Sequence, residues 1–135
     1  MITLLADANI EGQVDLLVAR MQSDTWKELW DYLGLCHVTF ADVGLDRADT
    51  DTVIWQRCQD AELLLLTDNR NDDGPDSLEA TIRARNTDRS LPIFTIGNIS
   101  HLQASTEYAD RVIDQLLSYI LELDEIRGTG RLFLP

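Results

Sequence analysis

The feature that most constrains the fold is a run of four leucines, residues 63–66, that leads directly into a polar segment, residues 67–76. An unbroken apolar run of this length is typical of a strand covered on both faces, as at the centre of a parallel sheet. Parallel strands need crossover connections, which are usually helices packed on the sheet. The run therefore predicts an α/β fold with this strand near the middle.

The rest of the chain alternates between short apolar segments and segments with helical periodicity. This alternation predicts one domain, residues 1–135, built as a three-layer α/β/α sandwich around a mainly parallel sheet of four or five strands. Residues 126–135 are expected to form a C-terminal tail. The expected strands are residues 1–6, 36–40, 62–66 and 91–96, and the expected helices are residues 9–23, 25–34, 50–61, 76–86 and 105–126.

The charge balance limits the partners that the protein can have. The chain has 24 acidic and 11 basic residues, a formal net charge of −13, which opposes binding of nucleic acid through the whole surface. A polyanion must therefore be bound locally, by a metal ion or by a few arginines. We expect a cytoplasmic protein without a membrane segment, because no apolar stretch is long enough to span a bilayer and the start of the chain does not resemble a signal peptide.

Two of the predicted strands end in polar residues. The first strand is followed by Asp7, and residues 62–66 are followed by Thr67, Asp68 and Asn69. In parallel α/β sheets, ligands bind outside the carboxyl ends of the strands. Both polar clusters are therefore expected at the same edge of the sheet, where oxygen-rich side chains suit Mg²⁺ or Mn²⁺.

Asp51 adds a third carboxylate, in the first turn of the predicted helix 50–61. At helical spacing it shares a face with Ile54, Trp55 and Cys58. A carboxylate on an apolar stripe is costly unless it is paired or bound to a metal. The helix N-terminus also stabilises an anion, so a capping role is the alternative, with Asp49 or Thr50 competing for it.

Several of these polar residues have purely structural explanations. Asp7 or Asn9 can cap the helix that follows the first strand. Residues 73–75 are typical of a solvated turn. Asp76 and Glu79 have the spacing of a capping box at the start of helix 76–86.

Three stretches together, LLADAN, DVGLDRADTDTVIWQRCQD and LLLLTDNRN, resemble a bacterial family of PIN-like domains over residues 2–100. The resemblance implies an α/β domain whose carboxylates bind Mg²⁺ or Mn²⁺ and hydrolyse RNA. It also implies a homodimer and a protein partner such as an antitoxin.

The family's site residues transfer to this chain only in part. Asp7 and Asp51 match the first two acids of the family, but its third, paired acidic position falls on Asn69 and Asn71, and Asp68 lies one residue early. Carried over, the resemblance implies catalytic roles for Asp7, Asp51 and Asp68, metal ligation by Asp7, Asp51, Asn69, Asn71 and Asp72, and substrate contacts from Asn9, Thr67 and Arg70.

The expected function is therefore a metal-dependent ribonuclease, with a catalytically degenerate binding or regulatory domain as the alternative. A flavodoxin-like or receiver module ranks lower, because it calls for a lysine near the last strand and the chain's single lysine is Lys27. The wide apolar face of residues 105–126 predicts core packing, part of which could serve a dimer. The apolar ending, residues 131–135, could dock on the core or on a second subunit.

Overall fold

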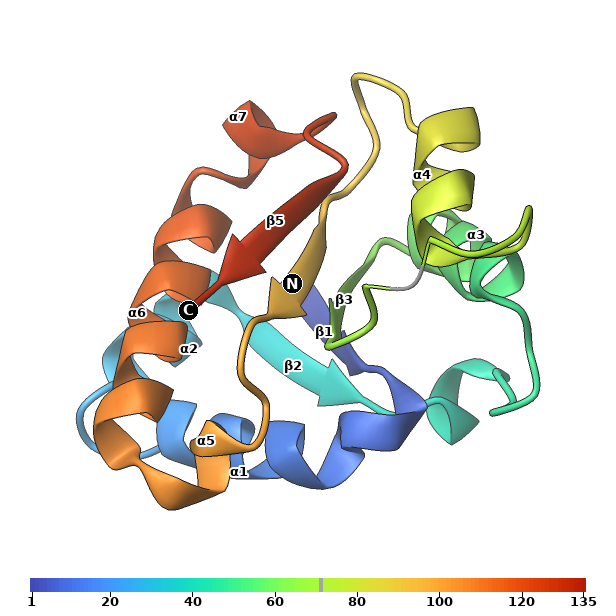
Figure 1. Cartoon of the computed structure of the whole chain (residues 1–135). Coiled ribbons are helices and arrows are strands. Elements are labelled where there is room, and N and C mark those ends of the chain that lie inside the picture. The colour runs from blue at the N-terminus through green and yellow to red at the C-terminus, as the bar shows by residue number, and fades with distance from the viewer. Residues whose placement is uncertain (71) are drawn as a thin grey trace.

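The structure is a computed structural model that describes residues 1–70 and 72–135. It is an α/β protein with a five-stranded, all-parallel sheet covered by helices on both faces, as predicted (Figure 1). The strands are β1 (Ile2–Ala6), β2 (Leu35–Val38), β3 (Leu63–Thr67), β4 (Ile93–Ile96) and β5 (Arg131–Leu134). The helices are η1 (Ala8–Ile10), α1 (Glu11–Met21), α2 (Lys27–Leu33), η2 (Ala41–Val43), α3 (Asp51–Asp60), α4 (Leu78–Arg85), α5 (His101–Ala104), α6 (Thr106–Leu121) and α7 (Leu123–Ile126).

The leucine run occupies the centre of the sheet. Strand β3 lies between β1 and β4, and all five of its residues are buried. Successive side chains of a strand point to opposite faces, so Leu64 and Leu66 enter one core while Leu63 and Leu65 enter the other. A strand buried on both sides has no place for polar alternation, which explains why its sequence is uniformly apolar.

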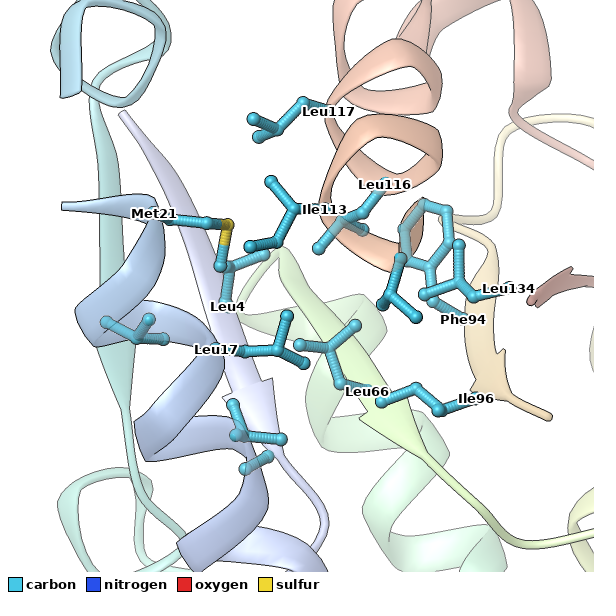
Figure 2. Packing of buried hydrophobic residues seen from close by; sticks show 14 of the residues in the cluster. Leu4, Leu17, Met21, Leu66, Phe94, Ile96, Ile113, Leu116, Leu117 and Leu134 are labelled. Carbon is cyan, nitrogen blue, oxygen red and sulfur yellow. The ribbon is translucent and has the colours of Figure 1, made fainter. Parts of the chain in front are cut away.

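The two cores differ in size. The larger one packs α1, α2, α5 and α6 against the sheet, and Figure 2 shows side chains of α1 and α6 meeting those of the strands, with Leu17 beside Leu66 and Ile113 beside Leu4. The smaller core packs α3 and α4 against the opposite face of the sheet, through residues such as Trp55 and Ile82. The apolar face of α6 is thus taken up by the core: Val112, Ile113, Leu116, Leu117 and Ile120 are all buried there.

The strand order, β2-β1-β3-β4-β5, is the one found in flavodoxin-like folds, whose ligand site lies where the direction of the strand order reverses. Here that point is between β1 and β3. The pairing of Ala6 with Leu66 places the next residues of the two strands, Asp7 and Thr67, side by side. The topology therefore puts the two polar clusters together at the carboxyl edge.

The expectation of a C-terminal tail at residues 126–135 is wrong. Residues 131–134 form β5, which pairs in parallel with β4, from Ile93 opposite Arg131 to Ile96 opposite Leu134. The apolar ending therefore docks on the chain's own sheet. Its sequence gave no sign of this, because the strand has four residues and its partner lies more than thirty residues earlier.

The predicted capping box of α4 is also wrong. The N-cap is Ser77, whose hydroxyl accepts a hydrogen bond from the backbone N–H of Ala80 at 3.2 Å. The helix starts one residue later than the box requires, so Asp76 lies outside it. The Glu79 carboxylate instead accepts from Arg131 Nε at 2.7 Å.

Within the described ranges, none of the helices has the length and apolar character needed to cross a bilayer.

Candidate active site

A cavity of about 400 Å³ opens at the carboxyl ends of β1 and β3, beside the start of α3. We call it the acidic pocket. It is lined by Asp7, Ala8, Asn9, Phe40, Arg47, Asp49, Asp51, Ile54, Asp68 and Asn69. The prediction that the polar residues following two strands meet at one edge is confirmed, and Asp51 joins them from the first turn of α3.

Asp7 is both a cap and a pocket residue. Its Oδ1 accepts from the backbone N–H of Ala8 at 2.8 Å, which makes it the N-cap of η1, and its Oδ2 accepts from the hydroxyl of Thr67 at 2.7 Å. Burial raises the pKa of Asp7 above its ordinary value, and the charges of Asp51 and Asp68 act in the same direction, while the two hydrogen bonds oppose them. The charges of Asp51 and Asp68 therefore lie close enough to Asp7 to disfavour its ionised form.

Asp51 does not cap its own helix. Thr50 does this, accepting from the backbone N–H of Val53 at 3.3 Å. The Oδ2 of Asp51 instead accepts from Asn69 Nδ2 at 3.0 Å and from the backbone N–H of Leu78 at 3.1 Å. Leu78 is the first residue of α4, where the helix dipole favours an anion. Asp51 thus ties α3 to the segment after β3 and to the start of α4.

The segment after β3 is held by side chains of the site itself. The buried hydroxyl of Thr67 accepts from the backbone N–H of Asn69 at 3.0 Å while donating to Asp7. Asp68 is half-buried and accepts from Asn9 Nδ2 at 3.2 Å. Thr67 and Asn9, expected to contact substrate, therefore position two of the carboxylates.

Among the described residues, three predicted site residues do not line the acidic pocket: Thr67, which lies next to it and bonds Asp7, Arg70 and Asp72. The Arg70 guanidinium donates to the backbone carbonyl of Gly97 at 3.1 Å, and both Arg70 and Asp72 line a different pocket. Asn71, expected as a metal ligand, lies outside the described residues. The strand order agrees with the flavodoxin-like or receiver alternative. The lysine that a receiver module needs is not at the site, because Lys27 lies on α2 and pairs with Asp31 at 3.3 Å.

The sequence did not single out Arg47 as a site residue. Its Nη2 donates to the backbone carbonyl of Ala8 at 3.0 Å, so a positive charge lies on the wall of a pocket with four aspartates. It comes from the segment between η2 and α3, where local spacing gives no indication of which way a side chain points. The pocket is also lined by Asp49 from this segment, by Phe40 at the start of η2 and by Ile54 of α3.

The oxygen donors of the acidic pocket fit a hydrated hard cation. Across the described ranges, no three His, Cys, Asp or Glu side chains are grouped closely enough to hold an ion by themselves. Mg²⁺ does not need such a cage, because it usually keeps several waters and takes one or two carboxylates. Asp7 and Asp51 can supply these, whereas Asn69 turns its amide nitrogen toward Asp51 and acts there as a hydrogen-bond donor.

Comparison of the chain with protein-family models, with curated proteins and with solved structures gives no match.

Proposed function

We propose that the acidic pocket binds Mg²⁺ or Mn²⁺ and that the protein is a metal-dependent ribonuclease. One observation carries this proposal: three carboxylates from separate elements, Asp7, Asp51 and Asp68, converge on a pocket at the switch point of a parallel sheet. Their repulsion contributes to the raised pKa of Asp7, and a cation is the partner that relieves it. That the substrate is RNA rests on the resemblance to PIN-like domains.

The three carboxylates and the residues that hold them have separate roles in this proposal. Asp7 and Asp51 would hold the cation, which when bound activates water and neutralises charge on a phosphodiester. Thr67 fixes the orientation of Asp7 through its 2.7 Å hydrogen bond. Asp68, half-buried and held by Asn9, is the carboxylate left to accept a proton from the attacking water.

The test is calorimetric titration of Mn²⁺ into the wild type and into the double variant Asp7→Asn/Asp51→Asn. We expect micromolar binding that the double variant loses. The matched control is Asp24→Asn/Asp114→Asn, which removes the same charge from exposed positions away from the pocket and should leave binding unchanged. No binding at millimolar Mn²⁺, or equal binding by all three proteins, would overturn the metal site.

A cleavage assay then tests the reaction. Labelled single-stranded RNA should be cut by the wild type in the presence of Mn²⁺, and not by the Asp7→Asn/Asp51→Asn variant or in the presence of a chelator. Mn²⁺ binding without cleavage of any RNA tested would count against the ribonuclease.

A specific contact favours the second candidate, a non-catalytic binding domain. The amide of Asn69 occupies the place beside Asp51 and donates to it at 3.0 Å, and an amide brings no negative charge. If this contact makes the wild-type site inactive, Asn69→Asp should tighten Mn²⁺ binding and produce RNA cleavage that the wild type lacks. If the wild type already cleaves RNA, the second candidate is excluded.

A further inference from the structure

A second pocket, of about 430 Å³, lies between the segment after β3, helix α4 and strand β5. Three arginines line it, Arg70, Arg83 and Arg131, together with the exposed aromatic ring of Phe133. We call it the basic pocket. In a chain with a net charge of −13, such a gathering of arginines is the kind of local site that a polyanion would require.

Arg131 is the buried member of this group. Its side chain is only 6% exposed, yet it carries a full charge. The Nε donates to Glu79 at 2.7 Å, and Nη1 donates to the backbone carbonyl of Asn69 at 2.7 Å and to the hydroxyl of Thr95 at 2.6 Å. The remaining nitrogen, Nη2, is buried and finds no acceptor among the residues that the structure describes. Buried donors are nearly always satisfied, so this one calls for an acceptor.

The acidic residues of the basic pocket do not neutralise its arginines. Glu79 is shared, because it lies 2.7 Å from Arg131 and 3.9 Å from Arg83. Arg70 forms no ion pair within the described part of the chain, and its guanidinium donates to a backbone carbonyl and lies 5.7 Å from the centre of the Phe133 ring. With Asp72 and Glu79 as its two acids, the pocket keeps a positive excess.

Asn69 links the acidic pocket to Arg131 of the basic pocket. Asn69 lines the acidic pocket and bonds Asp51 through its amide, while its backbone carbonyl accepts from Arg131 on the other side. A chain of phosphates that enters the acidic pocket would therefore pass the arginines within a short distance. Exposed Phe133 beside these arginines offers a surface on which an unpaired base can stack.

We infer that the basic pocket binds a backbone phosphate of single-stranded RNA, adjacent to the phosphodiester held at the acidic pocket. The inference rests on the proposed function for the position of the cleaved bond. Arg70 and Arg83 approach the phosphate from the exposed side, and Arg131 supplies the buried donor. Arginine suits this task because its planar fork matches phosphate oxygens.

The test uses the full chain and a short fluorescent single-stranded RNA, with binding followed by anisotropy in the presence of a chelator so that no cleavage occurs. The variant Arg70→Gln/Arg83→Gln changes two exposed side chains and should fold. The control is Arg89→Gln, which removes an exposed arginine that lines neither pocket. We expect the double variant to weaken binding by about tenfold or more and to lower the salt dependence by roughly 0.7 per lost phosphate contact. The control should bind as the wild type does.

A second measurement follows Arg131 itself without replacing it. Titration with inorganic phosphate should shift the NMR signal of the Arg131 Nε–H group in the wild type, and less so in Arg70→Gln/Arg83→Gln. If phosphate binds at Arg131 but the double variant binds RNA as tightly as the wild type does, the assignment of this pocket to RNA would be overturned.

The remaining outcomes are also decisive. Absence of RNA binding by the wild type, or equal binding by all variants, overturns the inference. The Mn²⁺ titration is independent of it: if Mn²⁺ binding fails but RNA binding still depends on Arg70 and Arg83, the proposed ribonuclease site fails while the phosphate site stands.

Discussion

Replacing Thr67 by valine tests whether the acidic pocket is organised through a single hydroxyl. Valine keeps the shape and the preference for a strand, but it removes the donor to Asp7 and the acceptor for the backbone N–H of Asn69. A hydrogen bond to a charged group contributes about 1.5–3 kcal/mol and a neutral one about 1 kcal/mol. Because Thr67 is fully buried, water cannot replace either bond. We expect Thr67→Val to lower the free energy of unfolding by about 2–4 kcal/mol.

The matched variant is Thr67→Ser, which keeps the hydroxyl and loses one methyl group, at a cost of about 1 kcal/mol. Urea denaturation of the two variants and the wild type gives the comparison. The difference between the valine variant and the wild type reports the loss of the hydroxyl, and the serine variant reports the cost of losing a methyl group while the hydroxyl is kept.

The pH dependence of this difference identifies Asp7 as the partner. The folded-state pKa of Asp7 is raised, so protonation favours the folded protein, and this stabilisation is present below the ordinary pKa and is lost as the pH rises through the folded-state pKa. Loss of the hydroxyl of Thr67 removes a bond that lowers this pKa, so Thr67→Val raises it further. The free energy of unfolding of the valine variant should therefore decrease relative to that of the serine variant as Asp7 ionises.

NMR titration of the Asp7 carboxyl checks the same point directly. Its pKa should rise in Thr67→Val and stay near the wild-type value in Thr67→Ser. A stability difference that is constant from acidic to alkaline pH, with an unmoved pKa of Asp7, would refute this account of the site.

Three further predictions concern other parts of the fold. Gly128→Ala should destabilise the protein by about 2–4 kcal/mol in urea denaturation, because φ at Gly128 is +87° and an added Cβ would lie 2.9 Å from the backbone of Asp88; a neutral effect would contradict this packing. The hydrogen bonds from Arg20 on α1 lower the pKa of Asp110. The stabilisation by ionised Asp110 is therefore present above the ordinary carboxyl pKa and is lost as the pH falls through the folded-state pKa. The stability deficit of Asp110→Asn should accordingly be measurable by thermal denaturation at neutral pH and vanish in acid, and a deficit that persists in acid would argue against the ion pair. Burial raises the pKa of Cys58 to about 12, so in a Cys36→Ser background its thiol should react with a thiol reagent only on unfolding, whereas rapid reaction of the native protein would show that it is accessible.

The sheet was predictable where a local pattern determines the environment. The apolar run of residues 63–66 is typical of a strand buried on both faces, and the rule that parallel strands share a carboxyl edge places Asp7 and Asp68 together. Asp51 could be added because a carboxylate on the apolar stripe of a helix needs a partner, which proves to be Asn69 together with the start of α4.

The sequence-based predictions were wrong where contacts between distant segments determine the structure. Strand β5 exists because β4 offers it an edge, and four residues give no pattern of their own. Glu79 had the spacing of a capping residue, but Arg131 on β5 takes its carboxylate. Arg131 could not be predicted as a site residue for the same reason. Its contact with Asn69 depends on the nearness of β5 to the segment after β3, about sixty residues earlier in the chain.

The unequal cores on the two faces of the sheet have a consequence for local stability. Helices α3 and α4 each bury three residues, whereas α6 alone buries seven, so the thinner layer should detach at a lower free energy than global unfolding requires. Backbone amides of α3 and α4 should then exchange with deuterium sooner than those of β3. Asp7 and Asp68 directly follow strands of the sheet, whereas Asp51 lies on α3, so each such opening event separates Asp51 from the other two carboxylates while the sheet stays folded.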